Sequence, residues 1–222
     1  MSKRETARRY TIFLFGQMFV ALGVAFTTKS ALGTSPISSI PYSLSLILPA
    51  LSMGVWTIIF NYLLIFFQIA ILKRNCKKIQ ILLQFFITLI FGYFIDFWMF
   101  CLKPVEPDMY VMKIVTLLTG CVIMAFGLYL QYIGNVVMLP GDAFIRAISD
   151  TYHKDFGKTR MVSDITMSSI AVVLCITFLG GLYGIREGTL IAALLIGNIF
   201  RFLIRKLARL TAVLIPEKEA AI

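Results

Sequence analysis

Residues 16–37 read GQMFVALGVAFTTKSALGTSPI, and residues 120–141 read GCVIMAFGLYLQYIGNVVMLPG. At a constant shift of 104 residues, four positions are identical: Gly16 and Gly120, Ala21 and Ala125, Gly23 and Gly127, Pro36 and Pro140. Further on, GYFIDF (92–97) matches GNIFRF (197–202) at a shift of 105. The two halves of the chain therefore resemble copies of each other. If each half holds three membrane spans, the copies sit upside down relative to one another, which is a common plan of secondary transporters.

The composition indicates an integral membrane protein. Of the 222 residues, 59% are hydrophobic and the mean hydropathy is +0.88, whereas soluble domains are about 45–50% apolar. A single soluble core cannot bury this excess. The formal net charge of +10 does not indicate a nucleic-acid partner, because the basic residues lie in short clusters between apolar runs. Such clusters set the orientation of spans and contact anionic lipid headgroups.

Metal, disulfide and catalytic motifs are missing from the sequence. The four cysteines are scattered without a C-x-x-C pair, and His153 is the single histidine. We therefore expect no zinc site, no disulfide framework and no cofactor. The sequence also lacks H-E-x-x-H, Walker A and G-x-S-x-G motifs. We do not expect an enzyme, and any transport would be driven by gradients or by a partner subunit.

Six segments are long and apolar enough to span a membrane, which takes roughly 20 residues each. They cover about 10–28, 53–72, 79–102, 112–133, 161–181 and 187–205. The apolar stretch 31–50 is different, because it contains Pro36, Pro41 and Pro49. Each proline removes an amide from the helical ladder, so a continuous spanning helix is not expected there.

The distribution of lysine and arginine predicts the orientation. With six spans and both termini inside, the inner segments hold 17 of these residues: Lys3, Arg4, Arg8, Arg9, Lys73, Arg74, Lys77, Lys78, Arg146, Lys154, Lys158, Arg160, Arg201, Arg205, Lys206, Arg209 and Lys218. The outer segments hold four: Lys29, Lys103, Lys113 and Arg186. If 31–50 crossed the membrane, the cluster at 73–78 would move outside and this asymmetry would collapse. The stretch therefore enters from the outer side without crossing, or lies in the interface.

The sequence thus predicts an all-α membrane protein built as a 3+3 inverted repeat. The repeats cover 10–102 and 112–205 and are joined by an outer linker at 103–111. Each repeat has a proline-broken short helix after its first span, and the second of these short helices is expected on the inner side at 141–152. The basic segments 1–9 and 206–222 are expected on the cytoplasmic side of the bacterial plasma membrane.

The starts of the two short helices are candidate binding elements. A helix that begins just after Pro36 or Pro140 presents free backbone amides and the positive end of a dipole, which suit a polar or anionic group. Ser35, Ser38 and Asp142 lie at these starts. The simplest interpretation is that such residues cap the helices, and the alternative is that they also contact a ligand.

Two pairs of charged residues lie near the inner ends of the spans. Asp142 and Arg146 are four residues apart, as are Arg160 and Asp164. The simplest interpretation of each pair is an i,i+4 contact along one helix. Asp164 lies about one turn inside an apolar run, where an unpaired carboxylate is costly.

Asp96 is the strongest single candidate, because intramembrane carboxylates usually face a cavity or a partner. It lies about six residues from the end of the third span. One interpretation is a partnered residue near the outer interface, and the other is a proton or substrate role. Its repeat counterpart, Arg201, is expected to reach the headgroups with its neighbours Arg205 and Lys206. Asn61 lies near mid-membrane, where polar side chains hold helices together or line a pathway.

Several motifs together resemble a known family. They are LGTSPI (32–37), Gly92 with Asp96, P-G-D (140–142), Arg160 with Asp164, and GIREGTLIAALLIGN (184–198) with its Gly188 and Thr189. Their order and spacing over about 10–205 resemble the YczE/YyaS/YitT family of bacterial membrane proteins, and its YczE-like branch in particular. That family usually has an arginine where this chain has Gly141, so an anion contact from that position is not expected unless Arg146 replaces it. The resemblance implies the architecture, since the family has no established activity.

Two functions remain open at this point. The inverted repeat, the paired proline-led loops and Asp96 favour a small secondary transporter or exporter of a small polar or anionic solute. The alternative is a membrane-embedded binding or accessory subunit for a partner protein, such as a transporter module or a biosynthetic enzyme, because about six spans is also the size of the vitamin-binding subunits of modular transporters. The expected surroundings are the lipid bilayer, and the sequence leaves a homodimer open.

Overall fold

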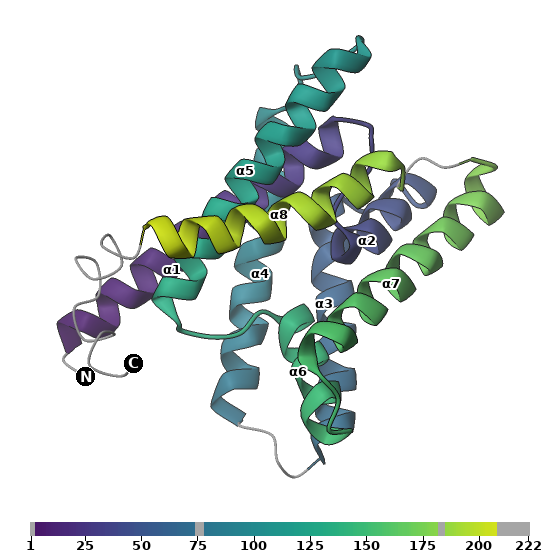
Figure 1. Cartoon of the computed structure of the whole chain (residues 1–222). Helices are drawn as coiled ribbons and strands as arrows, with labels where there is room; N and C mark the ends of the chain where they lie inside the picture. The colour runs from purple at the N-terminus through teal and green to yellow at the C-terminus, as the bar shows by residue number, and fades with distance from the viewer. Residues whose placement is uncertain (1–2, 74–77, 182–184, 208–222) are drawn as a thin grey trace.

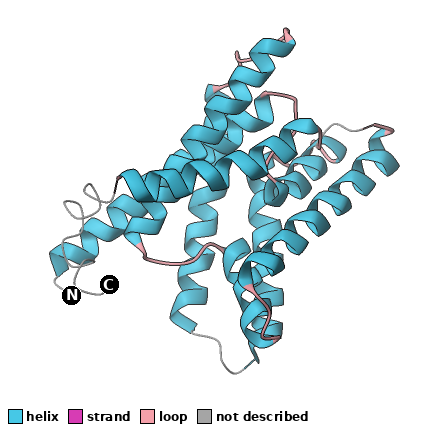
Figure 2. Cartoon of the chain, in the orientation of Figure 1, coloured by secondary structure: helices cyan, strands magenta, loops and turns pink. Residues whose placement is uncertain are grey.

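A computed structural model describes residues 3–73, 78–181 and 185–207. Over these ranges the chain forms eight helices and no strand (Figure 1, Figure 2). Some predictions from the sequence fall outside the described residues. They concern the basic residues Arg74, Lys77, Arg209 and Lys218, the cysteine Cys76, Gly184 of the last motif, and the tail after residue 207.

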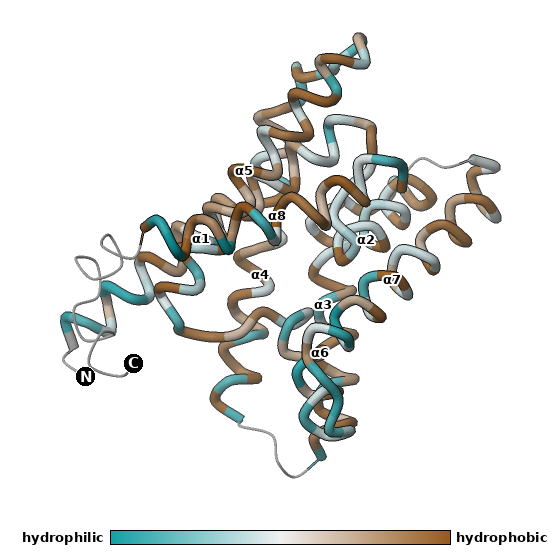
Figure 3. Tube along the Cα trace, viewed as in Figure 1, coloured by the Kyte–Doolittle hydropathy of each residue, from teal (hydrophilic) through white to brown (hydrophobic). Residues whose placement is uncertain are grey.

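Six of the described helices are long and apolar enough to cross a membrane. They are α1 (Lys3–Lys29), α3 (Met53–Leu72), α4 (Lys78–Cys101), α5 (Tyr110–Gly134), α7 (Phe156–Leu179) and α8 (Glu187–Lys206). Figure 3 shows apolar residues along most of their length. The prediction of six apolar helices is therefore confirmed. Helix α7 begins earlier than its apolar run predicted, because the first turn contains charged residues. Asp155 caps this turn, accepting a hydrogen bond from the Lys158 amide over 2.9 Å.

The other two helices, α2 (Pro36–Ile47) and α6 (Pro140–Thr151), are short. Each has 12 residues and is therefore about 18 Å long at about 1.5 Å per residue, whereas the hydrocarbon core of a bilayer is about 30 Å thick. Each begins with its proline, which has no amide to leave unpaired at a helix start. The two predicted proline-led short helices are thus present, and neither is long enough to cross a membrane.

Glycines let α1 and α5 pack in close contact. A Cβ atom on Gly23 would lie 2.8 Å from the Gly120 carbonyl oxygen, and Gly16 lies in the same way against Gly127. The pairs run in reverse order along the two helices, so α1 and α5 are antiparallel. Gln131 Nε2 of α5 donates a hydrogen bond to Gln17 Oε1 of α1 over 2.6 Å. Small residues and a buried amide pair are typical of tightly associated membrane helices.

The eight helices pack as two bundles, and each bundle takes two helices from each half of the sequence. In the first bundle, α1 packs against α4 and α5, and α5 packs against α8. In the second bundle, α2 and α6 each pack against both α3 and α7. One hydrophobic cluster, around Ile40, Phe60 and Met167, lies within the second bundle. The other, around Ala21 and Leu117, lies mainly in the first bundle but also takes in Met53 of α3 and Tyr42 of α2. Among the closely packed helix pairs of the described residues, α3 with α4 joins the two bundles.

Exchanging the two halves of the chain maps most of these contacts onto one another. The α1–α4 contact corresponds to α5–α8, α2–α7 to α3–α6, and α2–α3 to α6–α7. The exception is α3–α4, because its counterpart α7–α8 is not among the closely packed pairs of the described residues. In Figure 1, α7 and α8 lie close at the ends nearest in sequence and diverge toward their other ends. The inverted repeat and its orientation in a membrane stay predictions, with which most of these contacts agree.

Candidate binding site

The first turns of α2 and α6 meet within the second bundle. A Cβ atom on Gly141 of α6 would clash with the side chain of Ile37 of α2, and the two residues are repeat counterparts at the shift of 104. Because Pro36 and Pro140 open these helices, two positive helix ends lie in one place. Such ends favour an anionic or polar group.

Hydroxyl groups lie at the start of α2 but do not cap it. Ser35 occupies the N-cap position, yet its side chain makes no capping hydrogen bond. Instead Ser35 Oγ donates to Ser38 Oγ over 3.0 Å, and both residues are buried. The interpretation of Ser35 as a cap is therefore wrong, because its hydroxyl bonds a neighbouring hydroxyl rather than a backbone amide.

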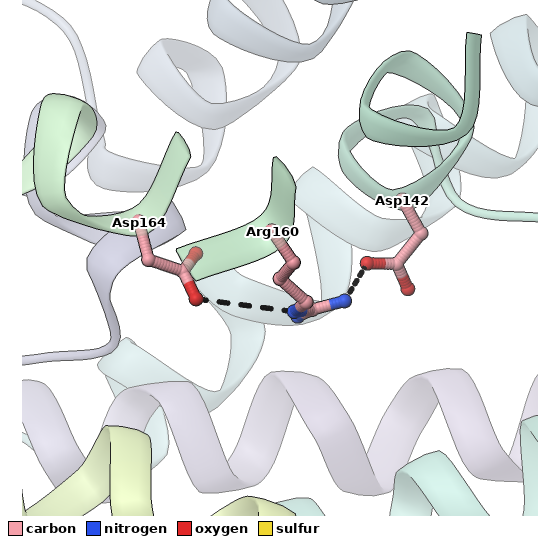
Figure 4. Close-up of polar contacts among 3 residues, drawn as sticks. All are labelled: Asp142, Arg160 and Asp164. Carbon is pink, nitrogen blue, oxygen red and sulfur yellow. Dashed lines mark hydrogen bonds and ion pairs between the residues drawn. The ribbon is translucent and has the colours of Figure 1, made fainter. Parts of the chain in front are cut away.

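Beside the start of α6, Arg160 bridges two carboxylates (Figure 4). Arg160 Nη1 donates a hydrogen bond to Asp142 Oδ1 of α6, and Arg160 Nε lies 3.9 Å from Asp164 Oδ2 on α7. The side chains of Arg160, Asp142 and Asp164 are 43%, 32% and 29% exposed, so a solute can still reach them. We name these three residues the charged network; it offers one cation and two anions between α6 and α7.

Of the two predicted i,i+4 pairs, one is present. The Arg160–Asp164 pair is confirmed. The Asp142–Arg146 pair is wrong, because Asp142 contacts Arg160 and Arg146 lies 3.7 Å from Asp150 on the exposed face of α6. Spacing along one helix could not show that α6 and α7 pack together and bring Arg160 to Asp142.

Asp96 belongs to a different place, the contact between α3 and α4. Its Oδ2 accepts a hydrogen bond from Ser52 Oγ over 2.6 Å, and its Oδ1 accepts one from the Gly54 amide over 2.8 Å. A Cβ atom on Gly92 would lie 2.7 Å from the Gly54 carbonyl oxygen. Asp96 is thus partnered, as one of the two interpretations expected, and it ties α4 to the first turn of α3 where the two bundles join.

Asn61 makes its described contact inside one helix. It is buried, and its Nδ2 donates to the Thr57 carbonyl oxygen over 2.9 Å within α3. None of the contacts described for Asn61, Asp96 and Arg146 involves the charged network. Asp142, Arg160 and Asp164 come together in the charged network. Ser35, Pro36, Ser38 and Pro140 lie at the two helix starts, which touch through Ile37 and Gly141.

The loop before α2 rests on the first turn of α8, a contact that the sequence did not reveal. Gly33 has φ +108, and a Cβ atom there would clash with the Thr189 side chain. The Gly188 amide donates to the Leu32 carbonyl oxygen over 2.9 Å. Two motifs that lie about 150 residues apart in the sequence therefore touch. This contact explains why both carry a glycine, since each glycine faces a neighbouring backbone.

A mainly apolar pocket of about 800 Å³ lies elsewhere on the second bundle. Its lining includes Leu44 of α2, Leu63 of α3, Phe144 of α6 and Val162 of α7, and it does not include the charged network. Leu63 and Val162 are exposed, and the lining also includes the charged residues Lys154, Asp155 and Lys158. In the described ranges, no three His, Cys, Asp or Glu residues are placed to hold a metal ion.

Comparisons with known proteins agree with the resemblance noted from the motifs. The chain is 27% identical over 221 residues to the "Uncharacterized membrane protein YczE" of Bacillus subtilis (strain 168), covering 99% of this chain and 96% of that protein. It is 28% identical over 173 residues to the "Uncharacterized protein YyaS" of the same organism, covering 78% and 82%. No solved structure matches. The profile described as "Family of unknown function (DUF6198)" matches residues 7–205, and the chain therefore belongs to this family of membrane proteins.

Proposed function

We propose that the chain is a small secondary transporter or exporter of a small polar or anionic solute across the bacterial cytoplasmic membrane, with both termini inside. The observation that carries this proposal is the meeting of α2 and α6 at Ile37 and Gly141 with the charged network beside it. Short helices whose starts converge near the middle of an inverted repeat are a recurrent way to build a solute site.

The division into two bundles supports the same proposal. A transporter must expose one site to each side of the membrane in turn, and two bundles that rock against each other achieve this. The second bundle has a hydrophobic cluster of its own, whereas Met53 of α3 and Tyr42 of α2 pack in the first-bundle cluster and would change neighbours in such a motion. The charged network lies on α6 and α7 of the second bundle, and its partly exposed groups lie where such a motion would open and close access.

The charges of the network narrow the class of solute. Arg160 already contacts Asp142 and Asp164, so a simple anion would compete with two carboxylates for one guanidinium. A polar solute with groups of both signs can bind the guanidinium through its anionic group and a carboxylate through its cationic group. Within the proposed class we therefore expect small zwitterionic solutes, such as amino acids, to bind better than inorganic anions.

A thermal-shift screen of the purified protein tests the proposal. The library holds amino acids, other organic anions, nucleobases, vitamins and amphipathic drugs, and a ligand at 100 times its Kd stabilises the fold by about 2.7 kcal/mol. We expect a stabilising solute that loses its effect in Asp142→Asn and in Arg160→Gln. Arg146→Gln is the matched control, because Arg146 is an exposed α6 cation paired outside the network. The same solute should then be carried into proteoliposomes by the wild type and not by the two network variants.

The alternative, a binding or accessory subunit that catalyses no reaction itself, predicts other results. A stoichiometric protein partner would copurify from native membranes, and no solute would cross proteoliposomes that contain this chain alone. A well-folded preparation that no solute stabilises would contradict the proposed transport site.

A further inference from the structure

Among the closely packed helix pairs of the described residues, α3 with α4 joins the two bundles. The corresponding helices of the second half, α7 and α8, do not pack in this way over their described residues. At the α3–α4 contact, Gly54 and Gly92 are buried against each other and Asp96 bonds the α3 start. The helices α7 and α8 occupy the corresponding positions in the second half of the chain. They are not among the closely packed pairs of the described residues.

The residues that form the α3–α4 contact have counterparts at α7 and α8. Ser52 and Asp155 are the N-caps of α3 and α7, and each accepts a hydrogen bond from the amide three residues on. Gly54 and Gly157 each follow their cap by two residues. On the partner helices, Gly92 and Asp96 correspond to Gly197 and Arg201 at the shift of 105.

The counterparts are prepared for contact but do not make it in the described structure. Gly157 and Gly197 are exposed, and a Cβ atom on Gly197 would meet nothing within 4 Å. Asp155 and Arg201 are also exposed, and among the described ion pairs neither takes part. A glycine inside a membrane helix weakens that helix, so an uncovered helical glycine is better explained when another state covers it.

We infer that the protein has a second conformation, in which the bundles separate at α3–α4 and close at α7–α8, with an Asp155–Arg201 ion pair in place of the Asp96–Ser52 contact. Gly157 then packs against Gly197 as Gly54 packs against Gly92. In an inverted repeat the two halves exchange their conformations between the two states, and this exchange assigns the closing residues. The inference deepens the proposed transport function and rests on it for its role, because it names the residues that close the inner side.

The charges support this assignment. At α3–α4, the carboxylate of Asp96 on the long helix meets a neutral serine cap and a helix start. At α8 the charge is reversed to Arg201, and the cap of α7 is changed from serine to Asp155. The two changes compensate each other, because a guanidinium at a helix start is unfavourable unless a carboxylate is there to pair with it. The expectation that Arg201 only reaches headgroups does not explain why the α7 cap that corresponds to Ser52 is the acidic Asp155.

Disulfide trapping tests whether the second conformation exists. In a cysteine-free background, an Asp155→Cys, Arg201→Cys variant in membranes is expected to form a disulfide under mild oxidation, which collects even a minor state. The control is Asp155→Cys, Leu203→Cys, because Leu203 packs in the first-bundle cluster and does not face α7. Gly197→Leu, which has open space in the described conformation, should fold normally and abolish the Asp155–Arg201 cross-link. Cross-linking no faster than in the control, or unchanged by Gly197→Leu, would overturn the inference.

A distance measurement tests the ion pair itself. Spin labels at Met161 and Phe202, both exposed, report on the separation of α7 and α8 in nanodiscs. We expect a long and a short distance, and Arg201→Gln should reduce the short-distance population about two- to fivefold, the range for a partly exposed ion pair. Arg205→Gln is the control one turn away and should leave the populations unchanged. Equal short-distance populations in Arg201→Gln and Arg205→Gln would show that the Asp155–Arg201 ion pair does not form.

The two proposals fail in different ways. A short α7–α8 distance without any solute that binds or crosses would leave this inference standing and remove the transport function. A transported solute with one α7–α8 distance, both with and without solute, would leave transport standing and remove the second conformation.

Discussion

A Cβ atom on Gly16 of α1 would lie 2.8 Å from the carbonyl oxygen of Gly127 of α5, and a Cβ atom on Gly127 would lie 2.8 Å from the carbonyl oxygen of Gly16. The other contact of these helices is similar, with 2.8 Å from a Cβ atom on Gly23 to the Gly120 carbonyl oxygen and 3.0 Å in the reverse direction. Because Gly16 corresponds to Gly120 and Gly127 to Gly23 at the shift of 104, the match between the two contacts is what a local twofold axis between α1 and α5 would produce.

Substitution of Gly127 by leucine is expected to destabilise the protein by about 1–3 kcal/mol, the range for an overpacked core. The leucine side chain would meet the backbone of α1, which cannot move away without separating α1 from α5. Thermal unfolding followed by tryptophan fluorescence measures the change. Gly197→Ala is the control, since a Cβ there meets nothing within 4 Å and alanine favours a helix. Equal melting temperatures for the two variants would contradict the tight crossing.

Loss of the Asp96 carboxylate is expected to weaken the contact between the bundles. Asp96→Ala removes two hydrogen bonds to a charged acceptor. Each contributes up to about 3 kcal/mol to the free energy of unfolding. A double-mutant cycle with Ser52→Ala should give a coupling free energy of about 0.5–3 kcal/mol, as for residues in contact. Additive effects of the two substitutions would show that the Ser52–Asp96 bond does not form in the membrane.

Reversal of the Asp142–Arg160 pair should preserve the contact between α6 and α7. We expect Asp142→Arg and Arg160→Asp each to lower stability by up to about 1 kcal/mol, because the pair is partly exposed. The double variant should recover part of the lost stability. The recovery is incomplete because the carboxylate introduced at position 160 is repelled by the native Asp164. Arg146→Gln should have no measurable effect, since its pair with Asp150 is well exposed. Denaturation of the four variants measures these differences.

The predicted orientation can be tested with single cysteines. Asp108→Cys lies in the exposed segment between α4 and α5, and Lys154→Cys lies in the exposed segment between α6 and α7. In a cysteine-free background, an impermeant maleimide should label position 108 in intact cells and position 154 only after permeabilisation. The reverse pattern would invert the orientation. Labelling of both positions in intact cells would show that α5, the one long helix between them, does not cross the membrane.

The sequence allowed prediction of the elements more fully than of their arrangement. The length and hydropathy of each apolar run were enough for the six long helices, and Pro36 and Pro140 were enough for the two short ones. The Arg160–Asp164 contact followed from spacing along one helix. The Asp142–Arg160 contact did not, because it depends on how α6 packs against α7. The grouping into two bundles also could not be predicted, since apolar helices of similar composition do not reveal their neighbours.

Because each bundle draws helices from both halves, neither can be completed while only the first half has been synthesised. The glycine face of α1 has no partner until α5 has entered the membrane, and the first bundle still lacks α8, the last long helix of the described residues. The second bundle likewise cannot form until α6 and α7 have been synthesised, because α2 and α3 pack against them. Biogenesis of this protein therefore ends in one late assembly step, in which helices already inserted exchange lipid neighbours for protein ones.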